Sequence, residues 1–343
     1  MPPYTLTDLS AAEGGAPRIL HGLAARAPLT FLRRGAEVAF EMAQAAVLDR
    51  LAPLKAGLRE VSEGTAARQG SSLALYLHWS PDGRVSPMVR RQLRLWRENG
   101  FDLVFVTNAA RRPPEADWAA VGAECLLRIH RENVGRDFGG WRDAAAVALA
   151  RLGPAEELLL ANDSVLGPFL PLAPLVTAWR EGGEGLFGLT ESLGGGPHLQ
   201  SYALLARGDA AVAQVLAHLA AFRDSRSKWR VVQQGEIGLS RRMGAARVRC
   251  AALFGYERLT TLVDDATRRS LGPRFTAAEG FARYPLNPCH HLWRVLVERM
   301  GFPFLKTELI RRNPGQLPGV QGWSTLMAPE DAEIIREHLE MMG

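Results

Sequence analysis

Short apolar runs alternate with helical patterns between residues 71 and 164. Apolar, β-rich runs occur at 71–79 (SSLALYLHW), 101–108 (FDLVFVTN), 123–132 (AECLLRIHRE) and 156–164 (EELLLANDS). Helical patterns separate them, clearest at 85–100, which Gly100 closes, and at 141–153. Short apolar strands that alternate with helices indicate parallel βαβ units. The sequence therefore predicts an α/β fold with a mostly parallel sheet flanked by helices.

The flanking regions carry weaker patterns. Strands are expected at 184–192, 201–207 and 246–254, and helices at 208–222 and 231–244. Residues 1–70 are expected to form a helical N-terminal extension, 71–263 the central ligand-binding domain, and 264–343 a helical C-terminal region packed on it. Within the extension an apolar stripe at helical spacing should pack on the chain's own domain, with a membrane-surface or partner-docking role as the alternative. The stripe comprises Phe31, Val38, Met42, Ala45, Ala46 and Leu48.

Composition excludes several classes of protein. Of 343 residues, 47% are hydrophobic and 22% charged, which is ordinary for a globular protein. The net charge of +5 suits anionic ligands, but no Arg-rich block is interleaved with aromatics, so nucleic acid is not an expected partner. Cys125, Cys250 and Cys289 are isolated, which argues against a disulfide framework or zinc site and favours a reducing cytoplasm. The sequence has no signal-peptide pattern and no apolar run long enough to span a membrane.

Polar residues follow each of the four predicted strands between 71 and 164. Because the carboxyl ends of parallel strands meet at one edge, these residues predict a polar ligand cleft there. Taken singly, each group is better explained as a turn or a helix cap, since Asn, Asp and Ser favour both; it is the four together that indicate a ligand cleft. The groups are His78, Trp79 and Ser80; Thr107 and Asn108; Glu132, Asn133, Gly135, Arg136 and Asp137; and Asn162, Asp163 and Ser164.

The motif search narrows the chemistry of this cleft. The first strand–helix turn has no GxGxxG, and the chain has no GxxxxGK[ST], GxSxG or HExxH. The remaining hypothesis for this cleft is a hard cation held by a carboxylate and by substrate phosphates. Asp163, at the tip of its strand, is placed to hold such a cation.

The stretch RENVGRDFGGWRDA, residues 131–144, stands out within the cleft. Gly135 and Gly139 let a backbone turn tightly or approach a ligand closely, and the amides at the helix start can face a phosphate. The alternative interpretation is a strand-to-helix turn with an ordinary Arg136–Asp137 salt bridge.

Five segments in order resemble the rhamnan synthesis protein F family, bacterial glycosyltransferase-like proteins of polysaccharide assembly. They are ENVGRDFGGW, LLLANDSVLGPFLPL, HLQSYALLARG, QQGEIGLSRRMG and NPCHHLWRVLVERMGFPFLKTELIRRNP, and the resemblance covers roughly residues 71–315. The same motifs look like a distant version of the inverting family-2 glycosyltransferases, whose fold is called GT-A. The resemblance implies a GT-A-like domain that binds a nucleotide-diphosphate sugar.

The resemblance also implies roles for individual residues. Asn162-Asp163-Ser164 matches the metal motif, so Asp163 would hold Mg²⁺ or Mn²⁺, although a second acid that is usual there is absent. Glu236 matches the catalytic base; its alternative role is a first-turn helix residue stabilised by the helix dipole. Donor contacts would come from His78, Asn108, Asn133, Gly135, Arg136, Asp137, Asn162 and Asp163. Acceptor or sugar contacts would come from Glu191, His198, Gln200 and Ser201, and diphosphate neutralisation from Lys306 and Arg311.

The expected function is a cytoplasmic glycosyltransferase, located either free or at the inner face of the cell membrane. It would move a sugar, L-rhamnose by the family name, from a nucleotide-diphosphate donor to a glycan or lipid-linked oligosaccharide. A non-catalytic carbohydrate- or nucleotide-binding module is the alternative, and a basic docking protein is the third. The oligomeric state is left open.

Overall fold

A computed structural model of the chain describes residues 4–10, 28–54 and 57–343. Its centre is a ten-stranded mixed sheet with the order β1-β11-β8-β10-β6-β3-β4-β5-β2, to which β9 adds beside β8. The strands are β1 (Thr7–Asp8), β2 (Leu58–Glu63), β3 (Ser72–His78), β4 (Asp102–Thr107), β5 (Cys125–Arg131), β6 (Glu157–Asn162), β8 (Gly185–Ser192), β9 (His198–Leu199), β10 (Ala203–Arg207) and β11 (Cys250–Phe254). The predicted α/β class is confirmed.

The predicted alternation is confirmed in the middle of the sheet. Strands β6, β3, β4 and β5 pair in parallel, and a helix lies between each two that are consecutive in the chain. β10 interrupts the parallel pattern because it runs antiparallel to both β6 and β8. The parallel pairing then resumes between β8 and β11. The sheet is therefore mixed, with its largest parallel block where the polar strand ends were predicted.

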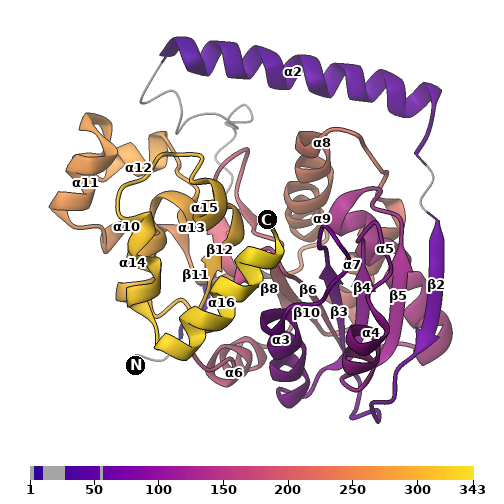
Figure 1. The fold of residues 1–343 in the computed structure, drawn as a ribbon. Helices are drawn as coiled ribbons and strands as arrows, with labels where there is room; N and C mark the ends of the chain where they lie inside the picture. The colour runs from indigo at the N-terminus through magenta and orange to yellow at the C-terminus, as the bar shows by residue number, and fades with distance from the viewer. Residues whose placement is uncertain (1–3, 11–27, 55–56) are drawn as a thin grey trace.

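Helices cover both faces of the sheet (Figure 1). One apolar core contains side chains of α3, α4, α6 and the C-terminal helices, and the other contains side chains of α5, α7 and α9. The bounds are α3 (Pro87–Glu98), α4 (Glu115–Gly122), α5 (Arg136–Leu152), α6 (Ala173–Glu181), α7 (Asp209–Ala221), α8 (Lys228–Val232), the π-helix η1 (Gln233–Ile237) and α9 (Gly238–Ala245). The C-terminal region contains α10 (Tyr256–Thr261), α11 (Asp265–Leu271), η2 (Pro273–Phe275), α12 (Glu279–Arg283), α13 (Pro288–His291), α14 (Trp293–Met300), α15 (Thr307–Arg312), η3 (Val320–Leu326) and α16 (Pro329–Met341).

The N-terminal segment differs from the expectation of helices alone. β1 and β2 add antiparallel strands to opposite edges of the sheet, against β11 and β5. Within the described part of this segment, α2 (Pro28–Leu51) is the one long helix, and it lies across the top of Figure 1 beside α8. The segment thus contributes both edge strands of the sheet.

The predicted stripe on α2 is confirmed in part. Val38 and Ala45 are buried, whereas Leu48 is 41% exposed. Met42 and Ala46 are half-buried, and the side chain of Phe31 lies outside the described residues. The stripe is wrong at Leu48 because α2 rests on the body along a narrow line and leaves its remaining faces to solvent.

A two-stranded ribbon ties the C-terminal region to the sheet's carboxyl edge. β7 (Val165–Leu166) follows β6 directly and pairs antiparallel with β12 (Leu305–Lys306). The register sets Lys306 opposite Val165, one residue beyond Ser164. This ribbon brings a cation from the far end of the sequence to the tip of β6.

Candidate active site

The glycine-rich turn between β5 and α5 is tight, as predicted, but its glycines face protein. Gly135 has φ +74° and Arg136 has φ +52°, both in the left-handed region. A Cβ on Gly135 would lie 1.9 Å from Asp224 Oδ1, and one on Gly140 would lie 2.2 Å from Leu77 Cδ1. Gly139 is equally crowded, since its Cβ would lie 2.4 Å from the Val134 carbonyl oxygen. Internal packing is thus a sufficient reason for Gly135 and Gly139, and the approach of a ligand to their backbone stays a prediction.

A row of alternating positive and negative side chains lies behind this turn, and none of the sequence motifs predicted it. The Arg131 side chain is fully buried and donates to Asp143 Oδ2 at 3.0 Å. Arg142 donates to Asp143 Oδ1 at 2.9 Å and to Asp224 Oδ2 at 3.0 Å. Buried charges require such partners because an unpaired one is costly. The only sequence signal was the density of Arg and Asp in residues 131–144.

Two carboxylates project from this edge with raised pKa values. Loss of hydration on burial raises the pKa of Asp137 to about 6, the charge of Glu236 adds to the rise, and that of Lys306 opposes it. Burial raises the pKa of Asp163 to about 7, and the charge of Asp137 adds to that rise. Asp163 Oδ2 nevertheless accepts a hydrogen bond from the Trp79 amide at 2.9 Å. The predicted convergence of Asp137 and Asp163 is therefore present in the structure.

Asn162 and Ser164 organise the tip of β6. The Asn162 amide nitrogen donates to Asp137 Oδ2 at 3.0 Å, and its oxygen accepts from the Ser164 hydroxyl at 2.5 Å. Lys306 Nζ donates to that same hydroxyl at 2.9 Å and lies 4.9 Å from the centre of the Tyr202 ring. Asn162 thus links the carboxylate of α5 to the cation of β12. Lys306, predicted from its position near a C-terminal motif, lies inside the cluster.

Glu236 sits on the π-helix η1, between α8 and α9. Ser201 donates to Glu236 Oε1 at 2.5 Å, and His198 Nε2 lies 3.7 Å from Glu236 Oε2. The Glu236 side chain keeps 23% exposure. Single π turns inside helices are frequent at functional sites, because the extra residue re-aims a side chain. Ser201 and His198 therefore lie beside Glu236, and their predicted contacts with an acceptor or a sugar stay predictions.

Three candidates are engaged in contacts within the protein. His78 is buried beside Thr107, and burial lowers its pKa to about 3. Asn108 uses both amide atoms to hold Arg131 and the Arg136 carbonyl. Gln200 accepts from Thr190 and Cys289.

Two further candidates hold backbone groups. Glu191 accepts from the backbone amides of Ser10 and Tyr256, and therefore ties strand β8 to its neighbours. Arg311 donates to the carbonyls of Met342 and Gly343 at the end of α16, so its role in diphosphate neutralisation stays a prediction. By contrast, Asn133 and Arg136 have exposed side chains, as donor contacts require.

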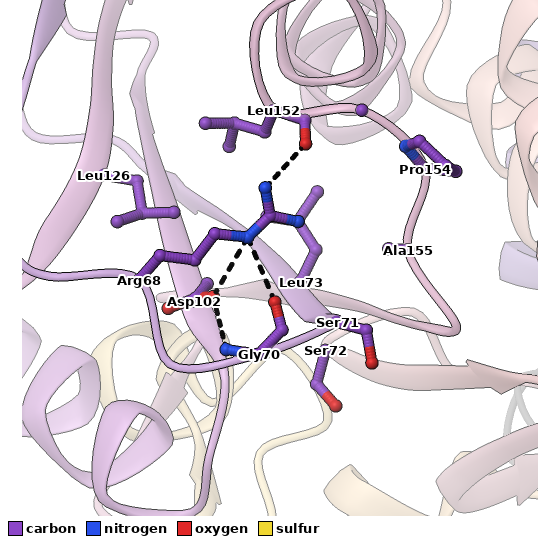
Figure 2. A pocket seen from close by; sticks show the side chains of 11 residues that line it. Arg68, Gly70, Ser71, Ser72, Leu73, Asp102, Leu126, Leu152, Pro154 and Ala155 are labelled. Atoms are coloured by element: carbon purple, nitrogen blue, oxygen red, sulfur yellow. Dashed lines mark hydrogen bonds and ion pairs between the residues drawn. The ribbon is translucent and has the colours of Figure 1, made fainter.

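Two pockets lie away from this cluster. The one in Figure 2 lies at the amino ends of β3, β4 and β6, where Arg68 closes it by donating to the carbonyls of Gly70 and Leu152. Asp102 accepts there from the Gln69 and Gly70 amides, so the site serves to tie loops together. A larger pocket of about 500 Å³ lies between α14, α16 and the loop after β7, lined mainly by apolar side chains. Neither contains the residues that the sequence predicts.

The donor set at the tip of β6 suits a divalent cation in part. Asp163 and Asp137 are oxygen ligands, the kind that Mg²⁺ and Mn²⁺ take. Burial raises the pKa of both carboxyl groups, and the positive charge of Lys306 opposes the rise. Across the described residues, no group of three or more His, Cys, Asp or Glu side chains is arranged to hold a metal. These carboxylates therefore fit a cation whose remaining ligands come from a substrate.

Comparisons with known proteins give distant likenesses. The chain is 30% identical over 136 residues to the uncharacterized protein y4gN of Sinorhizobium fredii, which is 38% of this chain and 35% of that protein. It is 30% identical over 207 residues to the virulence protein VirA of Vibrio anguillarum, which is 57% of this chain and 65% of VirA. The chain thus spans less than two thirds of each relative. No family model matches, so the resemblance to rhamnan synthesis protein F stays a prediction. In the described parts of the chain, no helix has the length and apolar character of a membrane span.

Proposed function

We propose that this protein is a GT-A-like glycosyltransferase that uses a nucleotide-diphosphate sugar. The observation that carries the proposal is the meeting of Asp137, Asp163 and Glu236 with Lys306 at the carboxyl edge of the parallel strands. Four separate elements contribute them: α5, the tip of β6, η1 and β12. Sugar transfer requires stabilisation of the leaving diphosphate and a general base, and this set of side chains can supply both.

The donor would bind at the β6 tip. Lys306 and the exposed Arg136 offer positive charge to the diphosphate. Asp163 and Asp137 would hold Mg²⁺ or Mn²⁺ together with phosphate oxygens, and the cation would supply charge neutralisation for the leaving diphosphate. Trp79 is 38% exposed and follows β3 directly, so its ring offers a flat apolar surface to a base or sugar.

Glu236 would act as the base. Its carboxylate removes the proton from an acceptor hydroxyl while that oxygen attacks the anomeric carbon. The bond between the anomeric carbon and the diphosphate oxygen breaks, and the nucleoside diphosphate leaves with the bonding electrons. One displacement inverts the anomeric centre. Ser201 and His198 act through Glu236, since the hydroxyl fixes one carboxylate oxygen and the imidazole faces the other.

The test is sugar transfer by the purified chain from a panel of nucleotide-diphosphate sugars to glycan and lipid-linked oligosaccharide acceptors. Glu236→Gln should lower transfer by about 10²–10⁴-fold, the usual contribution of a general base, and keep donor affinity within a few-fold. Glu298→Gln is the matched control, because Glu298 lies on α14 in an exposed ion pair with Arg294. Transfer by Glu236→Gln at the wild-type rate would exclude Glu236 as the base. A wild type that binds a nucleoside diphosphate and transfers no sugar would favour the non-catalytic binding module.

The metal role has its own test. Asp163→Asn should weaken nucleoside diphosphate binding chiefly when Mg²⁺ or Mn²⁺ is present. Isothermal titration calorimetry with and without EDTA measures this directly. Equal binding by the wild type in EDTA and in Mg²⁺ or Mn²⁺ would contradict a metal at Asp163.

A further inference from the structure

Asp224 lies in the linker between α7 and α8, with its side chain 8% exposed. One carboxylate oxygen, Oδ2, accepts from Arg142 at 3.0 Å. The other, Oδ1, has no hydrogen-bond partner among the described residues and lies against the turn, where a Cβ on Gly135 or Gly139 would come within 1.9 and 2.9 Å of it. A buried carboxylate oxygen that accepts no hydrogen bond lowers the free energy of unfolding. The position of Asp224 Oδ1 therefore needs an explanation other than the stability of the Arg142–Asp224 ion pair.

The contacts around the turn provide one. Arg131 donates to the Val134 carbonyl at 2.8 Å, and Asn108 donates to the Arg136 carbonyl at 3.3 Å. Asp224 closes the remaining side, against Gly135 and Gly139. The left-handed pair Gly135–Arg136 is thereby enclosed from three directions, and Asp137 follows it directly.

Asp224 also connects this turn to the other half of the cluster. Arg142 on α5 donates to the Phe222 carbonyl at 3.2 Å as well as to Asp224. Both acceptors belong to the linker that leads into α8 and then into η1, which carries Glu236. The Arg142–Asp224 pair is thus a direct tie between the helix of Asp137 and the segment of Glu236.

We infer that Asp224 is a positioning residue, which sets the Gly135–Asp137 turn and holds it in place relative to Glu236. The functional part of this inference rests on the proposed glycosyltransferase activity. The contacts that carry it do not depend on that activity.

The chain offers a matched control at the opposite edge of the sheet. Glu157 begins β6, is 10% exposed, and accepts from Arg180 at 2.8 Å and from Arg207 at 2.9 Å. Asp224→Asn and Glu157→Gln each remove one buried carboxylate from arginine partners. Both should lower stability, but only the first touches the turn. Arg142→Gln is the second test variant, in case Asp224→Asn does not fold.

The experiment measures two quantities on the full chain: amide hydrogen exchange of peptides covering 132–138, and affinity for uridine, thymidine and guanosine diphosphates tested separately with Mg²⁺. Asp224→Asn and Arg142→Gln should raise exchange in 132–138 by about tenfold or more, the usual effect of losing one charged hydrogen bond. Because the turn carries Arg136 and Asp137, both variants should also weaken binding of the tightest nucleotide by several-fold. Glu157→Gln should leave both at wild-type values. Unchanged exchange in both test variants, or the same change in Glu157→Gln, would overturn the inference. If the wild type binds none of the three nucleotides, the proposed function fails, and the exchange result still decides the role of Asp224.

Discussion

Two glycines with the same backbone conformation allow the packing role of the turn to be measured. Gly135 at the start of α5 has φ +74° and ψ 8°, and a Cβ there would lie 1.9 Å from Asp224 Oδ1. Gly319 at the start of η3 has φ +75° and ψ 2°, and a Cβ there would meet Arg294 at an ordinary contact distance of 3.6 Å. Alanine at either site incurs left-handed strain of roughly 1–2 kcal/mol. Alanine at Gly135 also overpacks the site, which typically adds about 1–3 kcal/mol. Gly135→Ala should therefore destabilise the protein by about 2–5 kcal/mol and Gly319→Ala by about 1–2 kcal/mol.

Urea unfolding of both variants measures the difference. In an Asp224→Ser background the contact is absent, so Gly135→Ala should cost no more than Gly319→Ala does, which leaves a coupling of about 1–3 kcal/mol between positions 135 and 224. Equal destabilisation by Gly135→Ala and Gly319→Ala in the wild-type background would refute the argument that Asp224 requires the glycine. It would also show that the turn needs the glycine for its backbone conformation alone.

Three further outcomes are expected. Burial lowers the pKa of His78 to about 3 and of His338 to about 4, so these two side chains bind more protons in the unfolded chain below about pH 6.5, and their contribution to stability should fall as the pH drops towards 4. Asp137 and Asp163, whose pKa values are raised to about 6 and about 7, act in the opposite direction over the same range, so the measured quantity is the difference between the wild type and His338→Asn. Urea titrations at several pH values should show a smaller loss of stability towards low pH in His338→Asn than in the wild type. Ser201→Ala should lower the transfer rate and keep donor affinity, because the hydroxyl acts through Glu236, and a loss of affinity instead would make Ser201 a donor contact. Arg311→Ala should leave nucleotide affinity unchanged and loosen the end of α16, read by hydrogen exchange, since its partners are backbone carbonyls there.

The middle of the fold was predictable because its strands are buried on both faces. Residues 73–77 and 158–161 are apolar throughout, and such runs between helical patterns favour a parallel sheet. β2 was missed because its sequence, LREVSE, is rich in charged and polar residues and lies on an edge, where burial is partial. The antiparallel direction of β10 was not predicted, since a strand's direction depends on its connections more than on its composition.

The candidate site likewise contains residues that could be predicted from the sequence and residues that could not. Asp163 and Asp137 were predictable because strand ends have known positions in a parallel sheet. The partners of Glu191 and Arg311, which are the amides of Ser10 and Tyr256 and the carbonyls at the end of α16, could not be predicted because they are distant in sequence. Asp224 was missed for the converse reason: it belongs to no motif, and only the folded chain brings it to Gly135.

The β7–β12 ribbon has a consequence for how the protein is made. Lys306 reaches the Ser164 hydroxyl across 142 residues of chain. At about 5–20 residues per second, roughly 7–28 s of synthesis separate the two. During that interval the nascent chain holds Asp137 and Asp163 without the lysine that offsets their charge. If the gene were split between residues 263 and 264, at the predicted end of the central domain, the first fragment would carry the acidic residues of the cluster and the second would carry Lys306. An anionic ligand would then bind only after the two fragments had assembled.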